Sequence, residues 1–168
     1  MNFRLLFIAF LIYGLFIGCG YKPTSNYVKK SINGTVFVDV KIDIKNLNNS
    51  ILIKDALINM LSSKLDIDIV PNRSMASSVV YGELRSVSES ILETDPSGYA
   101  KKYRETVTIF ISYTDKNKQT KNVTVSNYYD FIVSEGSVVS QAKRDEAITF
   151  AITNALSDVF AKIAINSI

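Results

Sequence analysis

The sequence predicts an α+β fold, a two-layer sandwich in which a four-stranded, mostly antiparallel sheet carries two helices on one face, in the order β-α-β-β-β-α. Three observations predict it. Four segments alternate apolar and polar residues, as half-buried strands do. Two segments repeat apolar residues at steps of three and four, as amphipathic helices do. Each pattern leaves one apolar face, and packing the helices on the sheet buries both faces.

A strand and a helix open the domain. Residues 35–44 alternate, and the apolar face carries Val36, Val38, Val40, Ile42 and Ile44. Asp39, Lys41 and Asp43 lie on the other face. Residues 50–65 then carry a helical stripe. Its apolar members are Ile53, Ala56, Leu57, Met60, Leu61 and Leu65. A connection that contains a helix is long enough for the first two strands to lie parallel.

Three further strands are expected to form an antiparallel meander: residues 78–88, 102–115 and 122–133. Asp95-Pro96-Ser97-Gly98 is a strong turn signal between the first two of them, and residues 115–121 form a polar loop between the last two. A long helix is expected over residues 141–164, where apolar residues recur with a period of 3.6. The whole of residues 35–168 is therefore interpreted as a single α/β sandwich domain.

The N-terminal segment predicts export. Arg4 precedes an uncharged apolar run over residues 5–17, which is too short to span a bilayer, since that takes about 20 residues. Length and flanks are typical of a signal peptide. The run ends at Gly18-Cys19, which resembles the bacterial lipobox. That resemblance implies cleavage after residue 18 and acylation of Cys19.

Residues 1–18 are thus expected to be a lipoprotein-type signal peptide, and residues 19–34 a lipidated N-terminus and polar linker. Three acyl chains on Cys19 would give an effectively permanent anchor. The alternative is a plain secretory signal that is cleaved elsewhere.

The composition argues against catalysis and against metal binding by this protein. The sequence has no His and a single Cys, so an imidazole base and imidazole metal ligands are excluded. It contains no P-loop, no G-x-G-x-x-G and no G-x-S-x-G motif. The formal net charge of +3 is too weak to predict nucleic-acid binding. We expect no enzymatic activity, no metal, no cofactor and no nucleic-acid partner.

Basic residues mark the candidate ligand site. They form two clusters: Lys101, Lys102 and Arg104 after the turn at Gly98, and Lys143 and Arg144 at the start of the last helix. Strand directions bring both clusters to one end of the sheet, where they would form one basic patch of about five charges. One interpretation is an anion site for phosphorylated ligand headgroups, formed by Lys143, Arg144, Lys101 and Lys102. The other is a solvated surface.

An ordered set of segments resembles the LptE family of lipopolysaccharide-assembly lipoproteins. The set begins with Cys19-Gly20-Tyr21 and continues with Ala56-Leu57-Ile58-Asn59-Met60-Leu61 and Val80-Tyr81-Gly82-Glu83-Leu84. It ends with Tyr103-Arg104-Glu105, Tyr128-Tyr129-Asp130-Phe131 and Gln141-Ala142-Lys143-Arg144-Asp145-Glu146. The fold implied by the family, a sheet with two helices on it, agrees with the periodicities.

The resemblance implies an outer-membrane lipoprotein that plugs and helps assemble the LptD β-barrel and takes part in lipopolysaccharide transport to the cell surface. The expected partners are the barrel, lipopolysaccharide and, through the acyl anchor, the inner leaflet of the outer membrane. The expected location is the periplasmic side, within the barrel lumen. Lys143 matches a position implicated in lipopolysaccharide contact.

Two other functions stay open at this point. An auxiliary binding lipoprotein of an envelope ABC-type lipid transporter would need an enclosed apolar pocket between sheet and helices. A plug needs a filled core. A structural lipoprotein that binds peptidoglycan or a secretion channel is the third alternative.

Overall fold

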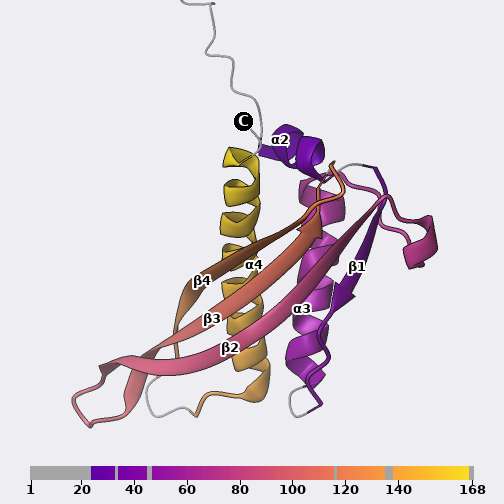
Figure 1. Cartoon of the computed structure of the whole chain (residues 1–168). Helices are drawn as coiled ribbons and strands as arrows, with labels where there is room; N and C mark the ends of the chain where they lie inside the picture. The colour runs from indigo at the N-terminus through magenta and orange to yellow at the C-terminus, as the bar shows by residue number, and fades with distance from the viewer. Residues whose placement is uncertain (1–23, 33, 45–46, 116, 135–137, 167–168) are drawn as a thin grey trace, which may run out of the picture.

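The computed structural model describes residues 24–32, 34–44, 47–115, 117–134 and 138–166 (Figure 1). The expected signal peptide over residues 1–18 and the expected lipid-attachment residue Cys19 lie outside these ranges, so both stay predictions.

The fold class predicted from the sequence is confirmed. One sheet has the strand order β1-β2-β3-β4. The first pair is parallel, and the other two pairs are antiparallel. Both long helices, α3 and α4, cover the same face of the sheet (Figure 1). The bounds are β1 Val36–Val40, α3 Leu47–Asn59, β2 Ser78–Thr94, β3 Ala100–Thr114, β4 Thr120–Ile132 and α4 Gln141–Ile165.

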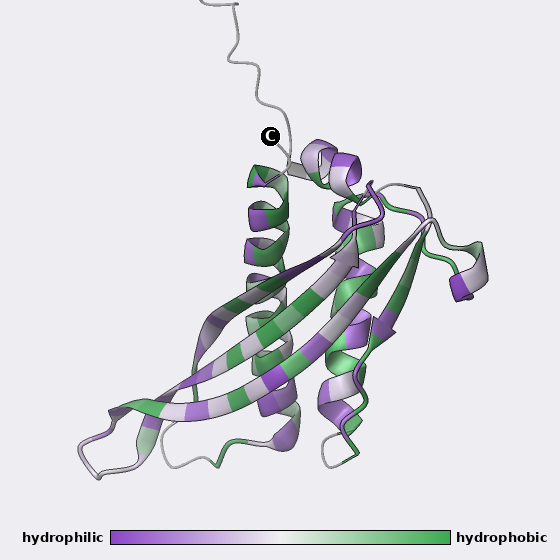
Figure 2. Cartoon of the chain, viewed as in Figure 1, coloured by the Kyte–Doolittle hydropathy of each residue, from purple (hydrophilic) through white to green (hydrophobic). Residues whose placement is uncertain are grey.

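Strand alternation separates a buried face from an open face. In β3, Val107, Ile109, Ile111 and Tyr113 are buried against the helices, while the residues between them are only partly covered. Figure 2 shows this alternation as bands of contrasting hydropathy along the strands. The open face carries hydroxyls, such as Thr108, which bonds Ser126 at 3.3 Å. β-branched residues suit both faces of such a sheet.

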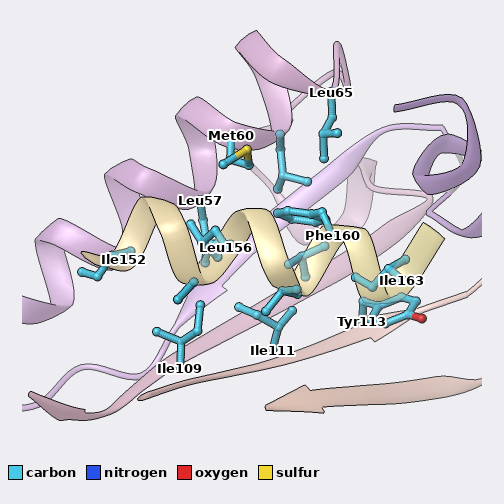
Figure 3. Close-up of a cluster of buried hydrophobic side chains, with 14 of the residues drawn as sticks. Leu57, Met60, Leu65, Ile109, Ile111, Tyr113, Ile152, Leu156, Phe160 and Ile163 are labelled. Atoms are coloured by element: carbon cyan, nitrogen blue, oxygen red, sulfur yellow. The ribbon is translucent and has the colours of Figure 1, made fainter. Parts of the chain in front are cut away.

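The core is filled where α3 and α4 meet the sheet (Figure 3). Ala151 and Ala155 are fully buried and let α4 lie close to the strands, while larger side chains such as Leu156 and Phe160 interlock with those of α3. At Gly82 of β2, an added Cβ would stand 2.5 Å from Leu57 Cδ1. Each large apolar side chain buried here contributes about 1.5–3 kcal/mol.

An additional helix, α2 (Thr24–Ser31), corrects the expected linker and the expected element order. Val28 is fully buried and Ile32, just beyond the helix, is 1% exposed. Both belong to the main core, and α2 packs beside α4. Two apolar residues among polar ones are too few to show a helical period in sequence, so tertiary packing decides the structure of this segment.

β1 is shorter than predicted, and β2 is longer. β1 ends at Val40 rather than at residue 44. The chain turns away because the Asp43 amide donates to Ser50 Oγ at 2.9 Å, which leaves Ile42 and Ile44 exposed. β2 continues to Thr94, and the end of the β2–β3 hairpin projects beyond the helices (Figure 1). α3 begins at Leu47 and leads into a π-helical turn, Met60–Lys64.

The docking of α2 can be tested by truncating Ile32, the buried residue that directly follows the helix. Ile32→Ala should lower the free energy of unfolding by about 2–5 kcal/mol, because it removes buried methyl groups and leaves a cavity. Asn26→Ala, at an exposed position of the same helix, is the matched control and should change little. Urea unfolding followed by circular dichroism measures both. Equal midpoints for the two variants would mean that the segment is a linker after all.

Candidate functional site

The start of α4 presents two of the predicted ligand residues. Ser140 has an extended backbone, and its side-chain oxygen accepts a hydrogen bond from the Lys143 amide at 3.2 Å. Such a cap satisfies one of the free amides of the first turn and fixes where the helix begins. Lys143 and Arg144 therefore sit in the first turn, as the sequence predicts.

Carboxylates offset both of these cations. Lys143 Nζ lies 2.9 Å from Glu146 Oε2, one turn along the helix. Arg144 Nε donates to Glu89 Oε2 of β2 at 2.9 Å. The hydrogen bonds to these two carboxylates raise the pKa of Lys143 and of Arg144. A ligand phosphate at this point would compete with Glu146 and Glu89 for the same donors.

Glu105 is a buried acid beneath this pair, and sequence reasoning missed it as a charged site. Its residue is 2% exposed, and within the described part of the chain Oε2 has no hydrogen-bond partner. Burial, followed by the neighbouring Glu89, raises the pKa of Glu105 to about 7. One signal in the sequence could have shown this burial. Glu105 stands two residues before Val107, so the strand alternation places it on the apolar face of β3.

Arg104 and Lys102 lie on the open face of the sheet. Arg104 forms a bidentate pair with Asp130 of β4, at 2.7 and 3.0 Å, and its guanidinium stacks 3.7 Å from the centroid of the Tyr128 ring. Lys102 Nζ is 3.9 Å from Asp130. The hydrogen bond from Arg104 holds the pKa of Asp130 below its usual range. Such charge-assisted pairs are the strong ones.

The two basic clusters share one end of the sheet but not one face, so the single patch expected from the sequence does not form. Glu105, which faces α4, and Arg104, which faces away from it, are neighbours in β3. The same alternation puts Lys101 on the α4 side with Lys143 and Arg144, and Lys102 on the open side. Lys101 has no ion pair among the described residues.

Aromatic side chains pack around the start of α4. Tyr103 stacks on Phe131, with ring centroids 5.5 Å apart, beside Val139. Tyr129 stacks on Phe150 of α4 at 4.8 Å. The first stack joins β3 to β4, and the second joins β4 to α4.

A hollow of about 420 Å³ lies outside the core, beside the point where β1 ends. Lys41, Ile42, Glu83 and Arg85 are among its lining residues. The space between sheet and helices is occupied by side chains instead, as the close approach at Gly82 shows.

Within the described ranges, no three His, Cys, Asp or Glu side chains are grouped as a metal ion requires. In the same part of the chain, α4 alone is long and apolar enough to cross a membrane, but half of its most apolar stretch is buried in the protein. The core helix of a soluble protein passes the same test.

Glu105→Gln should change how stability depends on pH. The pKa of Glu105 is about 7 in the folded chain against an ordinary 4.5, so between these values the folded state binds more protons than the unfolded state. The natural chain should therefore lose stability as pH rises from about 4.5 to about 7, and the variant should not.

Urea unfolding at several pH values measures the effect. At about pH 8 the Glu105→Gln chain should be more stable, by up to a few kcal/mol, and at about pH 4 the two chains should match. Asp55→Asn alters an exposed carboxyl of α3 and is the control. A natural chain whose stability does not fall across this range would contradict the assignment.

Comparisons with known proteins agree with this architecture. The family model LptE, described as lipopolysaccharide assembly, matches residues 39–163. Among solved structures, lipoprotein B of Nitrosomonas europaea is 10% identical over 90% of this chain and 93% of that one, with a TM-score of 0.52. A Caulobacter crescentus lipoprotein is 12% identical over 86% and 95%, with a TM-score of 0.50.

Rare lipoprotein B of Shewanella oneidensis is 14% identical over 79% of this chain and 98% of that one, with a TM-score of 0.49. A comparison with curated proteins gives no match. The structural likenesses to the Nitrosomonas and Caulobacter proteins concern the fold. The family match covers nearly the whole sheet and both long helices, and on that ground the chain belongs to the LptE family of lipopolysaccharide-assembly proteins.

Proposed function

We propose that this chain is an outer-membrane lipoprotein, anchored through Cys19, that occupies the lumen of an LptD-type β-barrel, helps to assemble it and takes part in moving lipopolysaccharide to the cell surface. The observation that carries the proposal is the family match over residues 39–163. The location is the periplasmic side of the outer membrane, within the barrel.

The shape and surface of the domain support a plug. A wide barrel encloses a polar, hydrated lumen. The open face of the sheet offers hydroxyls and ion pairs, such as Thr108 with Ser126 and Arg104 with Asp130, that can exchange hydrogen bonds with such a wall. An acyl anchor also raises the effective concentration of the domain near the barrel.

Lipopolysaccharide contact is proposed at the α4 end of the sheet. Lys101 and Lys143 are the first candidates for this contact, since Lys101 has no ion pair among the described residues and the ion pair of Lys143 is with Glu146 on its own helix. Arg144 forms an ion pair with Glu89 of β2. Lys102 lies on the open face of the sheet, so it would contact a ligand bound there. Phosphates attract such cations most strongly at low salt.

No observation favours the alternative of an auxiliary lipoprotein in an ABC-type lipid transporter. That function needs room for acyl chains between sheet and helices. Side chains of the main core fill this space, and a Cβ added at Gly82 would stand 2.5 Å from Leu57 Cδ1.

Affinity capture of the tagged lipoprotein from solubilised outer membranes tests the proposal. We expect a large β-barrel protein in about equal amount, and the intact mass of the captured chain should show cleavage before Cys19 and acylation of that residue. A tagged soluble form with Cys19→Ala controls for the anchor. Capture without any barrel protein, or an unmodified Cys19 thiol, would contradict the proposed plug or its anchor respectively.

Lipopolysaccharide binding is tested by Lys143→Gln with Arg144→Gln, which removes two charges and keeps side chains that can still bond Glu146 and Glu89. Affinity should fall several-fold at low salt, and the difference should shrink as salt screens the charges. Lys162→Gln, at the other end of α4, is the matched control. Unchanged affinity at low salt would leave these residues as surface charges only.

A further inference from the structure

More than half of strand β2 has a free edge. β1 pairs with β2 only over Ser78–Gly82, and the last bond of this side runs from the Lys41 amide to the Gly82 carbonyl at 2.9 Å. Among the described residues, no strand lies beyond that point on the β1 side of β2, which continues to Thr94. Unpaired amides and carbonyls along an edge are a template for another strand.

The middle of this edge, residues 86–91, lacks the usual protection against pairing. Proteins blunt edges with Pro, Lys or bulges, but β2 contains neither Pro nor Lys. Its register shifts fall between Leu84 and Ser86 and again after Ile91. The stretch 86–91 between them is regular, and its length matches an ordinary strand. Ile91 and Leu92 are exposed at 58% and 43%.

The stretch is complementary to itself in one antiparallel register. If two copies pair about a two-fold axis at Glu89, Val87 stands opposite Ile91 and Ser88 opposite Ser90. Just beyond the regular stretch, where β2 is irregular at both ends, Arg85 of each copy comes near Glu93 of the other. Residues directly opposite in an antiparallel pair share a face, so each of these matches must also agree in face.

The faces do agree. Val87 pairs with Val107 and Ile91 with Tyr103 in β3, which puts both on the α4 side. Arg85 stacks 4.3 Å from the centroid of Phe110, and Glu93 pairs with Lys102, which puts both on the open side. The two Glu89 side chains meet at the axis as like charges, which is unfavourable, and Arg144, bonded to Glu89 at 2.9 Å in each copy, offsets this repulsion.

The hollow beside the edge can receive the end of the β2–β3 hairpin of the second copy. In this register, the end of the partner's hairpin, from Glu93 onward, reaches the hollow of about 420 Å³ lined by Lys41, Ile42 and Arg85. It brings a second carboxylate, besides Glu83, to Lys41 and Arg85 and covers Ile42, which is 66% exposed. Leu92 and Tyr99 of the hairpin, both exposed, supply apolar surface for this contact.

We infer that residues 86–91 of β2 pair antiparallel with the same residues of a second copy of this chain, joining two four-stranded sheets into one continuous sheet with all helices on one side. This goes beyond the proposed function, because it describes the lipoprotein before it meets its barrel. The pairing covers an edge that would otherwise attract other strands.

A charge swap tests the register. The mature lipoprotein, purified in detergent without the barrel, should sediment as a dimer. Arg85→Glu alone or Glu93→Arg alone should weaken self-association about tenfold or more, because two symmetry-related attractions become repulsions. The combination of both substitutions should restore the dimer. Arg73→Glu, at an exposed site on a 3-10 turn, is the matched control and should have no effect.

A natural chain that sediments as a monomer at every concentration would overturn the inference. So would a double variant that folds, by circular dichroism, yet associates no better than the single variants. Neither result bears on the proposed function as a barrel plug, because that proposal is tested separately by affinity capture of the barrel protein.

Discussion

The structure depends on how closely α4 lies on the sheet. Ala151 and Ala155 keep the helix near the strands, and Ile109 and Ile111 of β3 fill the space that remains. A close-packed interior tolerates few voids, so α3 and α2 must fit the same surface. Side chains fill the described interior, so the candidate functional surfaces are the α4 end of the sheet, its open face and its free edge.

Charge is distributed so that most cations near the α4 end have an acidic partner. Arg144 reaches across to Glu89, and Glu105 stays beneath them with a pKa raised by burial. Glu89, close to Glu105 in this partly apolar setting, adds to the effect of burial and disfavours the charged form of Glu105. The cluster therefore links the β2–β3 hairpin to the helix through interactions whose strength varies near neutral pH.

Much of the fold was predictable, because β3, β4 and α4 carry long and regular periodicities, and their ends agree with the structure to within two residues. The failures have physical causes. α2 has only Val28 and Ile32 to show its period, and its stability comes from the contact with α4. The outer half of β2 is rich in serine and glutamate, so no apolar alternation extends the strand beyond residue 88.

The candidate site was only partly predictable. The sequence placed Lys143 and Arg144 at the start of a helix, and the cap at Ser140 confirms it. Local sequence patterns could not predict the partner of Arg144, because Glu89 lies 55 residues away in the sequence. Strand alternation also places Lys101 and Lys102 on opposite faces of the sheet. Counting basic residues along the sequence does not show on which face each one lies.

Methyl NOE spectra of the isotope-labelled lipoprotein, recorded with and without lipopolysaccharide, test the filled interior most directly. The account predicts strong contacts between the methyl groups of Ile109 or Ile111 and those of Ile152 or Leu156, unchanged by the lipid, with any acyl-chain contacts confined to surface residues. Acyl-chain contacts to Ile111 or Leu156 would contradict it, because they would require an opening between the sheet and α4.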